Sequence, residues 1–501
     1  MTANNPQVSA APRGSSQFLI AGLLLVTVAT VLAIMAVSAV SPDDQIRWGA
    51  IALAAFCGGM LPLMSVAARH DGLGLASWRI GPWSLVWGAL AFGLATMSWP
   101  GAQGGPVDEI WPGSIVRALW MIGVGLAMLT VGYCAGPYRL VTLHLRHITD
   151  ALGRRFTDQI RGPGVTWILL GVGTAAQLAS AVLSGRFGYV GDAAASVTTA
   201  SWYGQYLAVA GECVPLALAA AAIRACQARG LGSWLVVGTV FAADITEGAV
   251  AGSKQSFVVA ALAVIIPLSI VRHRLPTGAI AVAAIVFLLI IIPFTQAYRA
   301  SARGTVTLTT SQAVTGAPAI AGHVVTSDLS AAVLETSADY LSQRLQNIDT
   351  PAIVMQRTPS QIPYAPPDQL LIAPIADLIP RILWPDKPIL ATGYQISQEY
   401  YQLPAEIYTS SSVTPEADLY RHGGWFPLML GMFLLGCAIR IIDELTDPHR
   451  GMHGAFLILL LFPGIVKAES DYTTLLAGIP GIFLLWLAVV AISFTRRRQV
   501  Y

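Results

Sequence analysis

Apolar and polar stretches alternate along this chain at the spacing of membrane-spanning helices. Runs of roughly 17–25 apolar residues are long enough to cross a bilayer as α-helices. Twelve such runs are present, at about residues 18–40, 48–68, 81–99, 113–137, 162–185, 202–225, 231–250, 255–271, 276–297, 425–442, 452–468 and 472–495. The pattern predicts an all-α polytopic membrane protein with about twelve transmembrane helices.

A long polar, Pro-rich stretch from Tyr298 to Gly424 interrupts this series. It divides the chain into residues 1–297 with nine spans, the loop 298–424, and residues 425–501 with three spans and a basic tail. Within the loop, the apolar positions of Ser330–Asn347 recur at helical intervals, and Leu370–Arg381 is a second candidate interfacial segment. Because a bundle needs only short turns, the insertion indicates recognition or chemistry at this membrane surface.

The composition agrees with a membrane protein. Hydrophobic residues make up 55% and charged residues 11%, against about a quarter charged in soluble domains. A formal charge of +2 argues against nucleic acid as a partner. The first apolar run is long enough to span and further spans follow, so no cleavable signal peptide is expected. The cysteines all lie in apolar runs, typical of core residues rather than disulfides or metal sites: Cys57, Cys134, Cys213, Cys226 and Cys437.

Arginines gather in the loops of one side. Positively charged loops mark the cytoplasmic side, and the residues concerned are Arg139, Arg146, Arg154, Arg155, Arg161, Arg224, Arg229, Arg272, Arg274, Arg496, Arg497 and Arg498. With twelve alternating spans, both termini are then cytoplasmic and the loop between the ninth and tenth spans is extracytoplasmic. The protein is expected in the cytoplasmic (inner) membrane. The three lysines, Lys254, Lys387 and Lys467, all fall on the outer side.

Four short motifs give the chain a family likeness. They are GSK opening a helix at Gly252, an arginine pair at Arg299 and Arg303, IPRILWPDKP in the loop, and E-x3-Y-x2-GG from Glu416. With twelve spans and a large outer loop, this pattern resembles the Wzy-type O-antigen and exopolysaccharide polymerases. The motifs are short, so the likeness is mainly one of architecture.

The resemblance implies a metal-independent membrane glycosyltransferase of the GT-C type without a cofactor. Its donor and acceptor would be polyprenyl-diphosphate-linked oligosaccharides at the outer face of the membrane. It would join repeat units into a surface polysaccharide or exopolysaccharide. A flippase and a chain-length regulator are the candidate protein partners, and the lipid bilayer surrounds the enzyme.

Cations on the outer side are the candidate ligands of the diphosphate. Departure of that group builds negative charge, which fixed cations and backbone amides stabilise. The candidates are Arg186, Lys254, Arg299, Arg303, Arg381 and Lys387. Lys254 also lies near a predicted helix N-terminus, where free amides favour an anion. The alternative is that these side chains reach lipid phosphates or pair with loop acids.

An acceptor hydroxyl needs a general base within hydrogen-bond reach. Glu416, Asp418 and His422 cluster where the loop returns to the membrane, and we assign them as candidate catalytic residues. Tyr420 of the same motif is assigned to substrate binding. The alternative is a solvated helix cap in which TPEAD supplies an acidic first turn.

Acidic residues inside the spans form a second set. Buried carboxylates in a membrane are costly and by default face a cavity or a partner. Asp244 and Glu247 share a helix face at i, i+3, and Glu212 lies beside Gly211 and Pro215, where a break in the helix is predicted. These three acids are expected to line the substrate cavity. A structural ion pair with Lys254 or Arg186 is the alternative.

Two other functions fit the same pattern. Helical bundles with intramembrane acids also describe a transporter or a flippase of lipid-linked oligosaccharides, although internal repeats typical of transporters are not evident. An O-antigen-type ligase would use the same donor and a different acceptor.

Overall fold

The structure is a computed structural model of the 501-residue chain. It describes residues 14–67, 74–99, 110–184, 186–187, 190–191, 203–228, 230–302, 310–328, 347–370, 372, 379, 383–384, 392–404, 410–447, 451–467 and 469–496. The predicted amphipathic helix Ser330–Asn347 lies outside the described residues except for Asn347, and so does most of Leu370–Arg381.

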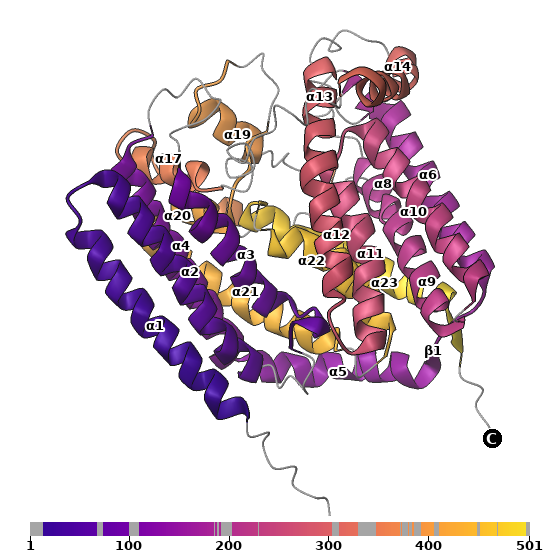
Figure 1. Ribbon diagram of the computed structural model, residues 1–501, viewed down its shortest axis with the longest axis horizontal. Helices are drawn as coiled ribbons and strands as arrows, with labels where there is room; N and C mark the ends of the chain where they lie inside the picture. The colour runs from indigo at the N-terminus through magenta and orange to yellow at the C-terminus, as the bar shows by residue number, and fades with distance from the viewer. Residues whose placement is uncertain are drawn as a thin grey trace, which may run out of the picture.

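Helices form nearly the whole molecule (Figure 1). Among the described residues, eleven helices are long and apolar enough to cross a membrane. Each coincides with a predicted span, so the prediction of an all-α multi-pass membrane protein is confirmed. The predicted eleventh span is α22, a shorter apolar helix at His453–Val466.

The N-terminal half contains α1 (Gly14–Ser38), α2 (Pro42–Ala67), η1 (Gly74–Ser77), α3 (Ile80–Gly88), η2 (Ala89–Gly93), η3 (Leu94–Ser98), α4 (Pro112–Ala135), α5 (Tyr138–Arg155), β1 (Phe156–Ile160), α6 (Pro163–Ser184), β2 (Arg186–Phe187), β3 (Val190–Gly191), α8 (Gly204–Gly211) and α9 (Cys213–Ala228). The remainder contains α10 (Leu231–Ala251), α11 (Lys254–Arg272), α12 (Thr277–Val286), η4 (Phe287–Ile291), α13 (Ile292–Ala302), α14 (Thr310–His323), η5 (Val324–Asp328), α17 (Asp349–Arg357), α19 (Thr392–Glu399), α20 (Pro415–Arg421), α21 (Trp425–Leu445), α22, α23 (Tyr472–Ser493) and β4 (Phe494–Arg496).

The two ends of the bundle are defined by contacts between distant segments. At one end, β1 pairs antiparallel with β4, and the Met452 amide donates to Asp158 Oδ1 over 2.7 Å. At the other end, the Trp111 amide donates to Gln356 Oε1 over 3.0 Å, and Asn347 Nδ2 donates to Glu469 Oε1 over 3.2 Å. The described part of the predicted outer loop therefore contacts the end opposite β1 and β4.

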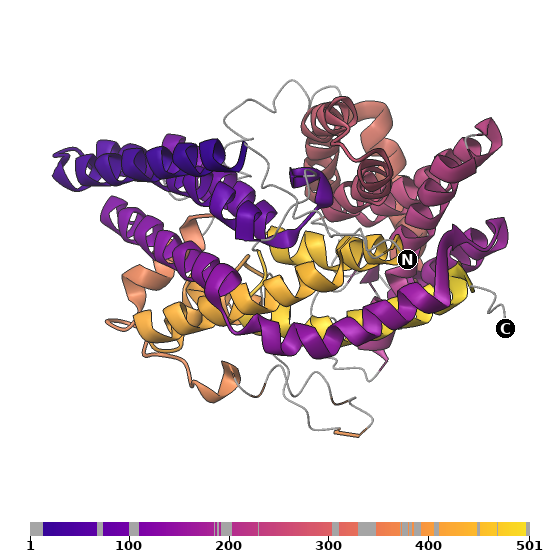
Figure 2. The ribbon, with the colours of Figure 1, turned by 90° about the horizontal axis from the view of Figure 1, so that it is seen from below.

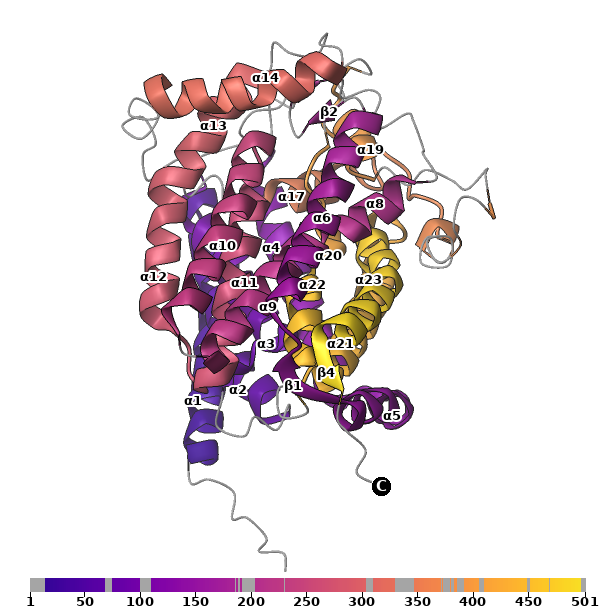
Figure 3. The ribbon, with the colours of Figure 1, turned by 90° about the vertical axis from the view of Figure 1, so that its right-hand side faces the viewer.

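The arginine-rich segment after α4 is not a simple loop, which corrects the expectation from its polar sequence. It forms the helix α5, which lies across the end of the bundle and contacts α21, followed by the strand β1 (Figures 1 and 3). Arg161 Nε donates to Phe494 O over 2.9 Å and ties this segment to the C-terminal strand. A helix with one polar face is stable here because its other face packs on the spans.

The C-terminal helices are the centre of the bundle. Figure 2 shows α21, α22 and α23 between the group α1–α4 and the group α6–α13. Helix α21 packs on α4, whereas α22 packs on α11 and α9, and α23 packs on α8. The large buried core is continuous through these contacts. Segments that lie beyond the long loop in sequence therefore join the two halves of the first nine spans.

Candidate functional site

The GSK sequence forms the sharp turn between α10 and α11. Gly252 has φ of 66°, a left-handed conformation that closes α10, and the Ser253 amide bonds to Gly248 O over 2.9 Å. The Ser253 hydroxyl then caps α11 by accepting from the Ser256 amide over 3.3 Å. Lys254 is consequently the first residue of α11, at the predicted helix N-terminus.

A basic cavity of about 550 Å³ lies at this turn. Three cations line it: Lys254 from α11, Arg299 from α13 and Lys467 from the end of α22. Tyr298 holds α13 in place because its hydroxyl donates to Val250 O at the end of α10. The lining also contains one carboxylate, Glu469, which accepts the hydrogen bond from Asn347. The structure thus brings together Lys254 and Arg299, two of the predicted diphosphate ligands.

The deeper walls of the basic cavity are apolar. Val258 and Leu262 follow Lys254 at i+4 and i+8 on α11, so Leu262 is about 12 Å along the helix from the lysine. Phe287 and Phe462 contribute from η4 and α22. The cavity is therefore amphiphilic, with cations at the helix ends and hydrocarbon walls within the spans.

An acidic cavity of about 350 Å³ adjoins it across the same turn. Ser253 and Gln255 line both cavities. Glu212, Asp244 and Glu247 all line the acidic one, as their positions in the spans predicted, and no cation is among the described residues that line it. In the described part of the chain, no three His, Cys, Asp or Glu side chains are arranged to hold a metal ion.

The predicted helix break at Glu212 is confirmed. Helix α8 ends at Gly211 and α9 begins at Cys213, with Glu212 between them. Pro215 lacks the amide that a continuous helix would bond to Gly211 O. The break presents Glu212 and Gly211 to the acidic cavity.

The predicted catalytic cluster lies elsewhere, on α20. All of this helix is buried, so the alternative of a solvated cap is wrong. Asp418 accepts from Arg421 Nε over 2.8 Å and from the Tyr472 amide over 3.0 Å, and the Thr414 hydroxyl caps the helix. His422 Nδ1 donates to Asp418 O over 2.7 Å, and its Nε2 faces Gln369 Oε1 at 3.3 Å. Asp418 thereby joins α20 to the start of α23.

Burial controls the protonation of this cluster. It raises the pKa of Asp418, opposed by Arg421, and lowers the pKa of His422, opposed by Asp418. Burial also raises the pKa of Glu416 to about 7. Glu416 packs against Gly125 of α4, and its Oε2 accepts no hydrogen bond from the described residues. Neither cavity at the GSK turn includes Glu416, Asp418 or His422 in its lining.

The other predicted ligands are dispersed. Tyr420 is buried and its ring meets Trp425 edge-on, with centroids 5.8 Å apart. Arg186 lies in β2, which pairs with β3. Arg303, Arg381 and Lys387 are outside the described residues. Lys467 was missed as a site residue, although it was one of the lysines noted on the outer side.

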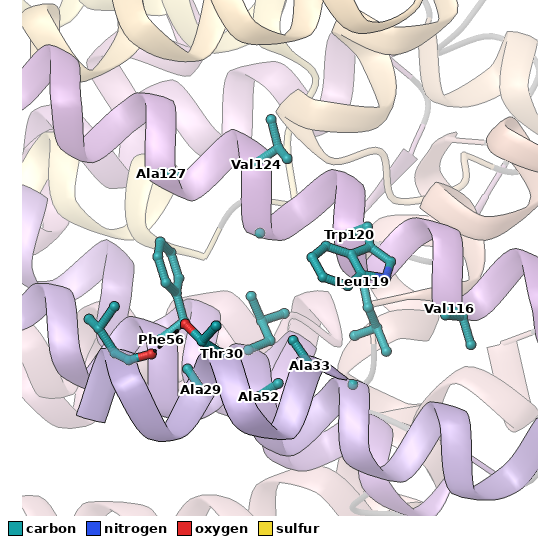
Figure 4. A pocket seen from close by; sticks show the side chains of 14 residues that line it. Ala29, Thr30, Ala33, Ala52, Phe56, Val116, Leu119, Trp120, Val124 and Ala127 are labelled. Carbon is teal, nitrogen blue, oxygen red and sulfur yellow. Dashed lines mark hydrogen bonds between the residues drawn. The ribbon is translucent and has the colours of Figure 1, made fainter. Parts of the chain in front are cut away.

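A third cavity, of about 320 Å³, is a groove without charged side chains. It lies between α4 and the pair α1–α2, and Figure 4 shows Phe56, Leu119 and Trp120 turned toward it. Small residues such as Ala29 and Ala52 leave the space open. None of the described residues that line the groove is titratable.

A second buried charge network, which was not predicted, lies near the end that carries α5. Asp443 is fully buried on α21 and accepts from the amides of Ile80 and Gly81 over 2.7 and 3.0 Å and from Tyr133 Oη over 2.8 Å. It thus supplies the hydrogen bonds that the first turn of α3 lacks. Arg440 bonds to Glu444 over 2.8 Å one turn away. This network joins α3, α4 and α21.

The fold and these cavities define a multi-pass helical membrane protein. The family model described as "Domain of unknown function (DUF8712)" matches residues 181–466, more than half of the chain, so the protein belongs to this family. The matched range contains the GSK turn and most of the lining of both adjoining cavities. Neither the curated proteins nor the solved structures contain a match.

Proposed function

We propose that this protein is a membrane glycosyltransferase that joins polyprenyl-diphosphate-linked oligosaccharide units into a polysaccharide. The observation that carries the proposal is the amphiphilic basic cavity at the GSK turn. A lipid diphosphate has an anionic head and a hydrocarbon tail, and the cavity offers Lys254, Arg299 and Lys467 above walls such as Leu262 and Phe462.

The leaving group explains why cations are needed. When the bond from the sugar to the diphosphate breaks, the departing oxygen becomes more negative, and preorganised cations stabilise that charge. Arg299 offers a planar fork for phosphate oxygens, whereas Lys254 and Lys467 act as point charges. The N-terminus of α11 adds the positive end of its helix dipole beside Lys254.

The two ends of the helical bundle also suggest how the protein is oriented in the membrane. Arg154, Arg155, Arg161 and Arg496 are all near the end where β1 and β4 pair, which favours a cytoplasmic location for that end. We therefore place the protein in the cytoplasmic membrane, with twelve spans, cytoplasmic termini and the GSK turn at the outer side. The large loop between the ninth and tenth spans would then be extracytoplasmic.

The double variant Lys254→Ala/Arg299→Ala tests the function through its binding of polyprenyl diphosphate and its formation of polymer. Full-length protein in nanodiscs is given radiolabelled polyprenyl diphosphate, and polymer formation is followed from lipid-linked oligosaccharide extracted from the host membrane. A charge-assisted hydrogen bond contributes about 1.5–3 kcal/mol, so the double variant should lose at least about 100-fold in affinity and form no polymer ladder.

Arg117→Ala is the matched control. Arg117 is on α4 and its NH2 donates to Ser114 Oγ over 3.1 Å, but it lines neither cavity. It should bind and polymerise like the wild type. Normal polymer from the double variant, or no binding by the wild type, contradicts the proposal.

The orientation has its own test. Ser360 is exposed next to α17, and Gln159 is exposed in β1 at the other end. In a background without native cysteines, Ser360→Cys should react with an impermeant maleimide in intact cells, and Gln159→Cys only after permeabilisation. The reverse pattern would invert the topology.

A flippase is the second candidate, and the acidic cavity within the spans is the observation that favours it. Carboxylates in spans are common in proton-coupled transporters. Reconstituted vesicles separate the two functions, because a flippase moves lipid-linked oligosaccharide across the bilayer without forming a glycosidic bond. A ligase is distinguished by transfer to a different acceptor.

A further inference from the structure

The acidic cavity presents polar oxygens from four neighbouring segments. Gln177 comes from α6, Glu212 from the α8–α9 break, Asp244 and Glu247 from α10, and Ser256 from α11. A diphosphate would be repelled here, because the described residues of the lining include three carboxylates and no cation. The ligand of this cavity is therefore chemically different from that of the basic cavity.

Two acceptor oxygens among these lining residues receive no hydrogen bond from the part of the chain that the structure describes. Asp244 is only 6% exposed, and its Oδ2 accepts no hydrogen bond from any described residue. Gln177 Oε1 is buried and equally without a donor in the described structure. Leaving a buried acceptor unsatisfied costs about 1–3 kcal/mol. A ligand that satisfies such oxygens must donate hydrogen bonds, as the hydroxyl groups of a sugar can.

We propose that this cavity binds the acceptor sugar and that Asp244 takes the proton of the attacking hydroxyl. The assignment rests on the proposed glycosyltransferase function. The acceptor oxygen forms a bond to the anomeric carbon of the donor while its proton moves to the Asp244 carboxylate. The bond from that carbon to the diphosphate breaks, and the electron pair leaves with the lipid diphosphate in the basic cavity.

The arrangement of the two cavities supports a donor site in the basic cavity and an acceptor site in the acidic cavity. They share Ser253 and Gln255, so a donor in one and an acceptor in the other meet at the GSK turn. Lys467 Nζ donates to Gln255 Oε1 over 3.0 Å, which links the basic lining to this shared wall. The titratable groups that line the cavity with Asp244 are Glu212 and Glu247, whereas α6 and α11 contribute amides and hydroxyls.

Asp244→Asn is the central test, because it keeps the shape and removes the base. Full-length protein in nanodiscs is assayed with lipid-linked oligosaccharide from the host membrane, and radiolabelled polyprenyl diphosphate is the binding probe. We expect transfer to slow by about 10²–10⁴-fold with the Kd of the probe unchanged. The wild-type rate should rise with pH as the carboxylate of the base loses its proton, and Asp244→Asn should not show this rise. Gln177→Leu should raise the KM for the acceptor and leave kcat nearly unchanged.

Thr246→Ala is the matched control, since Thr246 is exposed on α10 and bonds to Ala242 O over 2.7 Å. It should transfer normally. Transfer at the wild-type rate by Asp244→Asn, or unchanged acceptor KM in Gln177→Leu, overturns the inference even if donor binding is intact. If Asp244→Asn fails to fold, the Gln177→Leu result decides. A wild type that neither binds the probe nor forms polymer instead refutes the proposed function itself.

Discussion

Two of the regions that bury charged side chains differ in how those side chains are hydrogen-bonded. In the network near α5, both oxygens of Asp443 accept hydrogen bonds, from Ile80, Gly81 and Tyr133. In the acidic cavity, Asp244 is buried to a similar degree, yet its Oδ2 has no partner among the described residues. The first carboxylate is fully used to join three helices, whereas the second lines an open space.

The difference teaches that a buried charge in a membrane protein does not by itself mark a functional site. Burying a charge is costly, and hydrogen bonds within the fold offset that cost. A carboxylate whose two oxygens both accept hydrogen bonds within the fold is stabilised without a ligand. Asp418 on α20 resembles Asp443 in this respect, because it is held by Arg421 and the Tyr472 amide.

The largest expected effect is a loss of stability when the buried aspartate carboxylate of the network near α5 is removed. The matching change in the acidic cavity should have little effect. Asp443→Ala leaves two helix amides and a tyrosine hydroxyl without acceptors, and we expect the free energy of unfolding to fall by about 3–5 kcal/mol. Asp244→Ala should change it by less than about 1 kcal/mol, since no hydrogen bond to Oδ2 is lost. Reversible unfolding in detergent measures both. Equal losses would remove the distinction between the regions.

The burial of Glu416 should make the free energy of unfolding depend on pH. Burial raises the pKa of this carboxyl from its ordinary value of 4.5 to about 7, so the folded state binds the extra proton. The stabilisation from this proton is complete below the unfolded pKa of 4.5 and is lost as the pH rises through about 7. The total is on the order of 3 kcal/mol. Glu416→Gln should remove this pH dependence and be the more stable protein at a pH of about 8.

The same variant decides between a structural and a catalytic role for Glu416. If polymer formation by Glu416→Gln falls by about 100-fold or more while donor binding is retained, Glu416 acts on the substrate. Our expectation is near-normal polymer formation, because Glu416 packs against Gly125 rather than lining either cavity at the GSK turn.

Arg299→Lys sharpens the assignment of the basic cavity. The charge stays, but a single ammonium replaces the bidentate fork. We expect the Kd for polyprenyl diphosphate to rise by about tenfold, roughly 1.4 kcal/mol, with unchanged thermal unfolding. Arg299→Gln should weaken binding further. If both variants bind polyprenyl diphosphate with the Kd of the wild type, Arg299 does not contact the diphosphate.

The smallest effect is expected at the turn itself. Gly252 has φ of 66°, and a left-handed conformation costs a residue with a side chain about 1–2 kcal/mol. Gly252→Ala should therefore lower stability by that amount and weaken donor binding severalfold by displacing Lys254. Gly278→Ala is the control, because a Cβ at this helical glycine meets nothing within 4 Å. Thermal unfolding and donor binding of the two variants can be compared directly.

Many residues of the candidate site were predictable from the sequence, but which of them share a cavity was not. Lys254, Arg299 and the three acids were each identified from unusual positions, a cation at a span end or a carboxylate within a span. Their division into a basic and an acidic cavity was not predicted, because it depends on which helices are neighbours. Lys467 joins the basic cavity from beyond the long loop. Gln177 is an ordinary polar residue in the sequence, and only the structure shows that its Oε1 is buried without a donor among the described residues.

By itself, the sequence determined the helical spans, the break at Glu212 and the start of a helix at the GSK sequence. These depend on local properties: the length and limits of apolar runs and the missing amide of proline. Only the tertiary structure decided that α20 is buried, that Asp443 caps α3 and that two cavities of opposite charge share the GSK turn. Those features arise from packing between segments as distant as Ile80 and Asp443, which hydrophobic periodicity does not encode.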